Sequence, residues 1–372
     1  MSAYAIYRLP HEDHATLVQQ TEGEPAEFLS CTELNGKHGF VVAPFEVTAQ
    51  QPILLIRPDK IESRNVECGM WNEKSFMAEI QADGNLIPHS TFLRPVGSKR
   101  PSAERHIPQE YAIDFANYHA QLEAGIFRKI VLARCAEEAS DGAIDPMELF
   151  RRACELYPRM FISLVFTSKS GVWLIATPEI LLEGKAHDWH TIALAGTMRL
   201  EGDSLIGEGE KVTWATKDIQ EQRIVTTYIA ECLEQFTGDF HEEGPRTVRA
   251  ANLVHLRSDF TFTLPDGQHL GDLLHALHPT PAVCGLPKRE TFNFIIQNEH
   301  TPRRYYSGFM GMLDPDDGTH LYVSLRCMNI EGGHYHLYAG GGLLTDSTVS
   351  QEWLETEAKL ETMRQCIAIK KM

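Results

Sequence analysis

The fold class is decided by YYSGFMGMLD (305–314), HLYVSLRCMNI (320–330) and HYHLYAG (334–340), three apolar stretches that follow one another closely. Only the short sequences PDDG and EGG separate them, and both contain residues that favour tight turns. Strands joined by such short turns pair antiparallel, because a parallel pair needs a crossover of a dozen or more residues. This part of the chain therefore predicts an antiparallel meander.

The segments before the meander alternate between strand-like and helix-like patterns. FISLVFTSKSGVWLIATPEILLEG (161–184) predicts a hairpin that turns at SKSG, and KIVLAR (129–134) and HTIALAGTMRL (190–200) predict two further strands. Apolar residues recur at helical spacing in four segments, at residues 109–127, 148–157, 217–236 and 350–367. Antiparallel hairpins followed by helices predict an α+β fold rather than a doubly wound parallel sheet.

The N-terminal part of the chain is less regular. It contains two candidate strands, GFVVAPF (39–45) and PILLIRP (52–58), followed at 60–108 by a polar, proline-interrupted stretch that is either a linker or an irregular flap. A length of 372 residues suits one large domain or two ordinary ones. We expect a single domain over residues 1–372, with a less patterned part at about 1–108 and a motif-bearing core at about 109–372.

The composition is that of a soluble globular protein, with 43% hydrophobic and 23% charged residues. The net charge of −17 argues against nucleic acid and anionic membrane surfaces as partners. No apolar stretch approaches the length of about 18 residues that a membrane span requires. A small anionic substrate would have to be attracted by local cations, against the field of the whole protein.

The cysteines and the N-terminus predict a cytoplasmic protein. The eight cysteines include no C-x-x-C pair, and several lie in apolar runs, which favours buried thiols over disulfides or a zinc site. The first residues, MSAYAIYRLPHEDH, have neither the basic region nor the apolar region of a signal peptide. We expect a monomer, because the large predicted sheet could cover its own apolar surface.

Two helix starts carry similar pairs of carboxylates. Asp218 and Glu221 are three residues apart near the start of one predicted helix, and Glu352 and Glu355 are three apart near the start of another. Residues at this spacing share a helix face, so two such faces could hold a hard cation such as Mg²⁺. Acidic residues in the first turn of a helix are, however, most often solvated caps. Lys359 would share a face with Glu355, either as a surface ion pair or as an anion-binding cation.

Three further features are candidate functional groups. Lys129 opens an apolar strand, where it either reaches solvent at the edge or has a chemical role. Glu179 follows an apolar strand and a proline, so partial burial would raise the pKa of its carboxyl and make it a plausible acid. AGGG (339–342) lacks the spacing of a nucleotide-binding loop and predicts either a tight turn or a backbone that approaches a small anion.

The motif-bearing core resembles the chorismate-utilising enzyme family, which comprises isochorismate synthases, salicylate synthases, anthranilate synthase large subunits and aminodeoxychorismate synthases. Each matching stretch is weakly diagnostic alone, but all occur in the family's order across about 230 residues. The matching stretches are KIVLAR (129–134), ATPE (176–179), LAGT (194–197), KDIQEQ (217–222), LHPTPAVCG (277–285), YYSGFMG (305–311), YVSLRC (322–327), YAGGG (338–342) and QEWLETEAKL (351–360).

The resemblance implies a fold and a set of site residues. The fold would be a layered α/β/β/α sandwich with large antiparallel sheets. Lys129 matches the base that activates water, and Glu179 matches the acid that protonates a departing hydroxyl. Mg²⁺ would be bound directly by Glu221 and Glu355, and through water by Asp218 and Glu352. The residues that match substrate contacts are Gly196, Thr197, Tyr306, Arg326, Gly340 and Lys359.

The resemblance also implies an activity. Anthranilate synthases usually carry Gln at the position of Lys129, so the lysine favours water as the nucleophile. We expect an isochorismate synthase, which adds water at C2 of chorismate and releases the C4 hydroxyl with Mg²⁺ as cofactor. The alternatives are a salicylate synthase, which then eliminates pyruvate, and a non-catalytic chorismate-binding homologue. Isochorismate would enter menaquinone, siderophore or salicylate biosynthesis. Gln222 departs from the histidine that the family usually has there.

Overall fold

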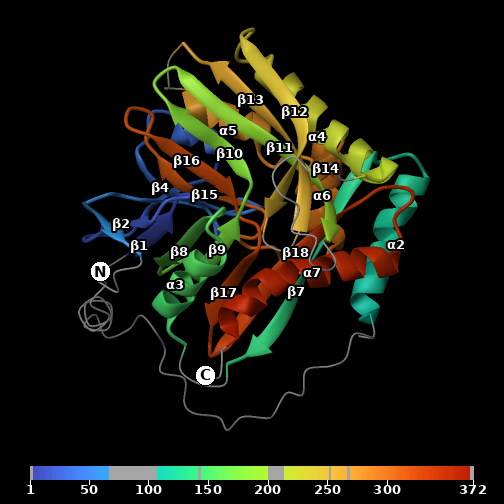
Figure 1. Ribbon diagram of the computed structural model, residues 1–372, viewed down its shortest axis with the longest axis horizontal. Coiled ribbons are helices and arrows are strands. Elements are labelled where there is room, and N and C mark those ends of the chain that lie inside the picture. Colours follow the sequence, from blue (N-terminus) through green and yellow to red (C-terminus); the bar gives the residue numbers. More distant parts are fainter. Residues whose placement is uncertain are drawn as a thin grey trace.

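Two large antiparallel sheets face each other, and helices cover the outer face of each (Figure 1). The computed structural model describes residues 3–66, 107–140, 144–199, 213–250, 253–265 and 269–368. Every strand pairing within these ranges is antiparallel. The predicted α+β class and the layered sandwich are therefore confirmed.

Each sheet has nine strands. The first sheet contains, in spatial order, β14 (Gly285–Leu286), β7 (Lys129–Ala139), β18 (His334–Leu343), β17 (Cys327–Glu331), β9 (Gly171–Thr177), β8 (Phe161–Thr167), β1 (Ala3–Arg8), β2 (His14–Gln20) and β6 (Lys60–Asn65). The second sheet contains β12 (Phe240–Ala250), β13 (Leu253–Thr263), β11 (Asp188–Arg199), β10 (Ile180–Lys185), β16 (Thr319–Val323), β15 (Phe309–Leu313), β4 (Gly39–Ala43), β5 (Ile53–Ile56) and β3 (Ala26–Phe28).

The apolar core is divided into layers by the two sheets. Between them lie side chains from both, such as Phe161 of the first sheet, whose ring stacks on Tyr322 of the second with 4.3 Å between ring centroids. Helices α3 (Pro146–Leu156) and α7 (Val349–Ile367) cover the first sheet. Helices α4 (Thr216–Leu233) and α5 (Leu270–Leu277), with the 3₁₀ turn η1 (Cys31–Leu34), cover the second. Helices α2 (Gln109–Glu123) and α6 (Lys288–Asn298) pack against β7 at the edge of the first sheet.

Helix α7 is fixed by its start and by its buried face. The Thr348 side chain accepts a hydrogen bond from Gln351 N at the N-terminus, which satisfies one of the free amides of the first turn. The helix then buries Leu360 and Met363 in the layer outside the first sheet. Docked in this way against β18, it holds Glu352 and Glu355 near the end of that strand.

The predicted meander is wrong in one respect, because its strands divide between the two sheets. Strands β15 and β16 pair in the second sheet, whereas β17 and β18 pair in the first. The chain crosses between the sheets at Leu325 and Arg326, and Arg326 has a φ of 47°, which ends the extended conformation. The predicted hairpin over 161–184 divides similarly, because β8 and β9 lie in the first sheet and β10 lies in the second.

Three other sequence predictions concern the glycines of 339–342, the N-terminal strands and the stretch at 60–108. The glycines of 339–342 lie inside β18, so they form no tight turn. The strands at 39–45 and 52–58 are present as β4 and β5, but β1, β2, β12 and β13 were not predicted. Most of the stretch at 60–108 lies outside the described residues; its first residues form β6. The N-terminal strands pair with core strands in both sheets.

The described cysteines and helices agree with the sequence. Seven cysteines fall in the described ranges and all are free thiols, six of them buried. Among the helices in those ranges, none combines the length and the apolar character that crossing a bilayer would need.

Candidate active site

Two of the crossings between the sheets each place a buried, ionisable side chain at one cavity. Glu179 lies in the crossing from β9 to β10, and Arg326 lies in the crossing from β16 to β17. Their side chains are 3% and 5% exposed, and both line the same cavity. Because β10 and β16 are neighbours, the crossings lie side by side, and Val323 N donates a hydrogen bond to Glu179 O at 2.9 Å.

Eight of the predicted site residues line this cavity. They are Glu179, Gly196, Thr197, Glu221, Tyr306, Arg326, Gly340 and Lys359. The other four reach the site through neighbours: Lys129 contacts Glu221, Glu355 contacts Lys359, Asp218 packs on Gly196 and Glu352 packs on Gly341. Sequence motifs from both sheets and from α4 and α7 are thus brought to one place.

Glu179 has the environment of a carboxylic acid that keeps its proton near neutral pH. Burial raises the pKa of its carboxyl from 4.5 to about 7, and the negative charge of Glu221 acts in the same direction. The positive charges of Lys129, Arg326 and Lys359 oppose this rise without cancelling it. A carboxyl with this pKa can donate a proton at physiological pH and then be reprotonated from solvent.

Lys129 is fully buried, so the snorkelling alternative does not hold. Its Nζ lies 2.9 Å from Glu221 Oε1, while Glu221 Oε2 accepts a hydrogen bond from Gly196 N at 3.3 Å. Burial by itself raises the pKa of Glu221, but the charge of Lys129, helped by Lys359 and Lys217, outweighs burial and lowers it. The glutamate is therefore an anion held between a lysine and a backbone amide.

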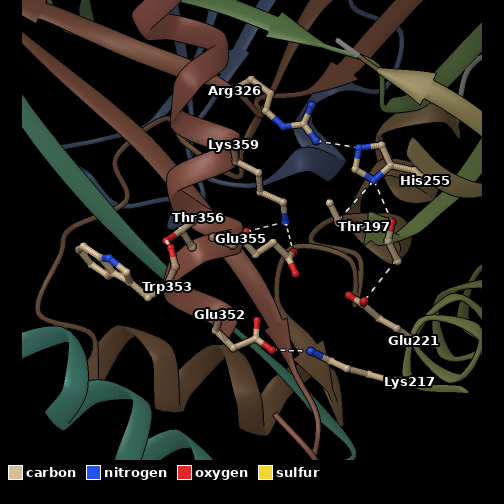
Figure 2. A network of polar contacts seen from close by, with 12 residues as sticks. Thr197, Lys217, Glu221, His255, Arg326, Glu352, Trp353, Glu355, Thr356 and Lys359 are labelled. Atoms are coloured by element: carbon tan, nitrogen blue, oxygen red, sulfur yellow. Dashed lines mark hydrogen bonds and ion pairs between the residues drawn. The ribbon is translucent and has the colours of Figure 1, made fainter. Parts of the chain in front are cut away.

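A lysine also pairs with each of the two α7 carboxylates (Figure 2). Lys217 of α4 donates to Glu352 Oε1, and Lys359 donates to Glu355 Oε1 at 2.7 Å and to Gly340 O at 2.8 Å. Within the described ranges no three acidic, histidine or cysteine side chains stand close enough to hold an ion as they are placed. Each carboxylate is turned towards a lysine instead.

The residues nevertheless fit a hard divalent cation. Glu352 and Glu355 approach the backbone of β18 so closely that a Cβ on Gly341 would lie 2.7 Å from Glu352 Oε2 and 3.9 Å from Glu355 Oε1, and one on Gly342 would collide with Glu221. Burial and the neighbouring carboxylates raise the pKa of Asp218 to about 6 and of Glu352 to about 7. These four carboxylates, of which Glu352 is buried and the others are partly buried, have more negative charge than the three neighbouring lysines neutralise, which suits Mg²⁺.

His255, on β13, is a site residue that the sequence analysis missed. Its Nδ1 lies 2.9 Å from Gly196 O, which can only accept, so Nδ1 carries the proton. Its Nε2 then carries a lone pair and accepts a hydrogen bond from Arg326 Nη2 at 2.9 Å (Figure 2). Burial and the charge of Arg326 hold the pKa of His255 well below its usual value, so the ring is neutral. The neutral ring orients Arg326 and leaves Arg326 Nη1, which has no partner among the described residues, for an anion.

The remaining wall of the cavity is backbone and apolar side chains. A register shift in β11 between Ala195 and Met198 displaces Gly196 and Thr197 from the regular ladder. Gln222, the departure from the family pattern, points away from the cavity, and its Nε2 donates to Ala193 O and Ser258 Oγ. This substitution therefore affects packing under α4 and leaves the neighbouring Glu221 in place.

Comparison with known proteins gives a consistent assignment. The family described as chorismate binding enzymes matches residues 69–368. Isochorismate synthase EntC of Escherichia coli (strain K12) is 30% identical over 238 residues, which cover 63% of this chain and 61% of that protein. The salicylate biosynthesis isochorismate synthase of Pseudomonas aeruginosa is 30% identical over 279 residues, which cover 74% of this chain and 58% of that protein. The aligned stretches therefore span less than two thirds of these relatives' own lengths.

A solved structure extends the comparison to the fold. MenF, the menaquinone-specific isochorismate synthase from E. coli, superposes with a TM-score of 0.73 at 22% identity, covering 98% of this chain and 89% of that one. The cavity between the sheets brings two cationic side chains, Arg326 and Lys359, together with the buried carboxyl of Glu179. The family match covers well over half of the sequence, and the chain belongs to the chorismate binding enzymes.

Proposed function

We propose that this protein is an isochorismate synthase that uses Mg²⁺. One observation carries the proposal: a fully buried lysine, Lys129, lies beside the same cavity as a buried carboxyl, Glu179, whose pKa is about 7. A base and an acid of this kind are what an exchange of hydroxyl positions on the ring of chorismate requires. The curated relatives, which are isochorismate synthases by name, support the same reaction.

Lys129 and Glu179 divide the proton transfers. Lys129, which must be in its neutral amine form for this step, takes a proton from a water molecule as the water oxygen bonds to C2 of the ring. Both ring double bonds shift, the C4–O bond breaks, and Glu179 gives its proton to the departing hydroxyl, which leaves as water. One water is consumed and one is released, so the product is an isomer of the substrate. The buried position of Glu179 keeps it protonated until this step.

The cationic side chains and the backbone of the cavity would bind the substrate. Chorismate carries two carboxylates, and Arg326 and Lys359 are the cationic side chains that line the cavity. Arg326, whose Nη2 is held by His255, offers its free Nη1 to one of these carboxylates. Gly196, Thr197, Tyr306 and Gly340 supply the remaining surface.

The metal would be held by the carboxylates of α4 and α7. Glu221 and Glu355 are the proposed direct ligands, with Asp218 and Glu352 acting through water. When bound, Mg²⁺ would neutralise a substrate carboxylate and withdraw electron density from the ring. Its ligands would have to exchange their lysine partners for the metal, which leaves Lys129 unpaired from Glu221 and available to water.

Product analysis tests the proposal. Purified protein incubated with chorismate and Mg²⁺ should yield isochorismate, separated by liquid chromatography and identified by mass and nuclear magnetic resonance. Salicylate with pyruvate as the accumulating products would replace the proposal with a salicylate synthase. No conversion by protein that binds chorismate would indicate a non-catalytic homologue. The names of the relatives include a menaquinone-specific and a salicylate biosynthesis isochorismate synthase, and they support either pathway as the destination of the product.

A further inference from the structure

The edge of β7 that carries Lys129 is paired with a strand for only two residues. Strand β14 places Leu286 opposite Lys129 and Gly285 opposite Ile130, and then ends. The next contact, Val131 N to Cys284 O at 2.7 Å, is the last that this segment supplies. The carbonyl of Val131 and the amide of Ala133 point to the same side, and both residues are buried, so these groups need partners.

A buried ion pair takes the place of the missing strand. Arg303 Nη2 donates to Val131 O at 2.7 Å, and Glu299 Oε1 accepts from Ala133 N at 2.8 Å. The two side chains are joined by a bidentate contact, Nε to Oε2 at 2.6 Å and Nη2 to Oε1 at 2.7 Å. The pair therefore offers β7 a donor and an acceptor two residues apart, as a neighbouring strand would.

The same guanidinium also holds a second lining segment of the cavity, the one that runs beside β7. Arg303 Nη1 donates to Val283 O at 2.7 Å, so one planar group spans Val131 and Val283. Both valines line the cavity, whereas Arg303 does not. The carbonyl of Arg303 further accepts a hydrogen bond from Tyr306 N at 2.9 Å, and Tyr306 is another lining residue.

A purely stabilising role does not explain this pair. Both side chains are 3% exposed, and a buried ion pair of this kind can often be replaced by apolar residues without loss of stability. What an apolar pair cannot reproduce is the set of directed bonds to Val131, Ala133 and Val283. Lys129 lies two residues before Val131 and so on the same face of β7, where a displaced strand would move its ammonium group.

We propose that the Glu299–Arg303 ion pair is a positioning unit, which fixes β7 at Lys129 and holds the neighbouring lining residues Val131 and Val283 together in the wall of the substrate cavity. This inference deepens the proposed function and rests on it for the identity of the substrate. Arg303 acts through other residues and does not itself touch the substrate. Its removal should therefore impair the reaction more than it impairs folding.

Three variants test the inference. Glu299→Gln combined with Arg303→Met removes both charges together, so no unpaired charge is left buried and the protein is expected to fold. Arg303→Lys keeps the charge but cannot reach two carbonyls and a carboxylate at once. A displacement of about 1 Å at a reacting group costs about 10²-fold in rate, so both variants should lose roughly that factor in kcat/KM. A displaced Lys129 should lower kcat, and displaced cavity residues should raise KM. In Arg303→Ala, guanidinium at non-denaturing concentration should restore part of the lost kcat.

Arg8 provides a matched control. It is also buried, at 2% exposed, and its guanidinium donates to the backbone carbonyls of Tyr157 at 2.7 Å, Pro158 at 2.9 Å and Met160 at 3.1 Å, none of which lines the cavity. Arg8→Met should lower the melting temperature and leave both kinetic constants within about twofold of wild type.

The outcomes separate this inference from the proposed function. Wild-type kcat and KM in the double variant, or kinetic losses in Arg8→Met as large as those in Arg303→Lys, would overturn the positioning role. If wild-type protein makes no isochorismate, the proposed function fails, and chorismate binding by calorimetry still tests the cavity walls. In that case weaker binding in the double variant supports the inference, and unchanged binding overturns it.

Discussion

Replacing Glu179 with Gln tests the proposed acid in two independent ways. The carboxyl is buried, and its pKa of about 7, compared with 4.5 for an ordinary glutamate, is the net result of burial and Glu221 against Lys129, Arg326 and Lys359. A proton held at pH 7 instead of 4.5 corresponds to about 3 kcal/mol of difference between the protonated and ionised forms in the folded protein. Gln keeps the shape and hydrogen-bonding capacity of the protonated acid but has no proton to give.

The first readout is the pH dependence of kcat/KM. A general acid must be protonated, so wild-type activity should be lost on the alkaline side as pH rises through about 7, tenfold for each further pH unit. Glu179→Gln should lower kcat by about 10² to 10⁴-fold and abolish that limb in whatever activity remains. Initial rates of isochorismate formation, followed by chromatography at constant ionic strength, measure both effects.

The second readout is stability. The folded-state pKa of Glu179 lies above the unfolded one, so its contribution is fully present below pH 4.5 and is lost as pH rises through about 7. The free energy of unfolding of wild type, relative to Glu179→Gln, should therefore fall by about 3 kcal/mol between about pH 4 and about pH 8. Urea denaturation of the two proteins at each pH gives this difference.

Glu183→Gln is the matched control. Glu183 lies on β10, the strand that begins directly after Glu179, but outside the cavity, where it accepts hydrogen bonds from Tyr322 and His320. The substitution should leave the alkaline limb unchanged. The assignment of Glu179 would be refuted if Glu179→Gln kept wild-type turnover. It would also be refuted if the variant kept the alkaline limb of kcat/KM and its free energy of unfolding changed with pH as that of wild type does.

Three further predictions concern the remaining groups of the site. Lys129→Gln should lower kcat by about 10² to 10⁴-fold while chorismate still binds in calorimetry, and turnover within tenfold of wild type would exclude Lys129 as the base. Mg²⁺ should raise the melting temperature of wild type but not of Glu221→Gln, because a cation that binds only the folded state stabilises it; equal shifts would remove Glu221 from the metal site. His255→Phe deprives Arg326 of its Nε2 partner and should raise KM for chorismate about tenfold at little cost in kcat, whereas an unchanged KM would contradict the orienting role.

The parts of the fold that the sequence predicted are those with local patterns. The helices of 109–127, 217–236 and 350–367 and the strand at 129–134 each carry their own apolar periodicity. The division of the meander between two sheets depends instead on the strands with which the segments before and after Arg326 pair. The residues around this crossing are apolar enough to resemble one continuous strand, so no local pattern marks it. Strands β12 and β13 were missed because their polar residues obscure the alternation.

The residues of the candidate site could likewise be predicted only where a local pattern marks them. Its carboxylates could be paired from helical spacing, and Lys129 and Glu179 attracted attention because charged residues are unusual beside apolar strands. Nothing local marks His255 or Arg303, since their importance comes from carbonyls and a guanidinium far away in sequence. A histidine inside the apolar run LVHL was the one available signal, and it does not distinguish a structural ring from a site residue.

In the proposed reaction, Lys129 activates a water molecule that becomes the C2 hydroxyl of the product. Wild-type protein is incubated with chorismate and Mg²⁺ in H₂¹⁸O, the reaction is stopped at low conversion, and the isochorismate is analysed by mass spectrometry. We expect one ¹⁸O atom in each product molecule, located at C2. Isochorismate without the label would mean that the hydroxyl moves within the substrate, and would contradict the roles given to both Lys129 and Glu179.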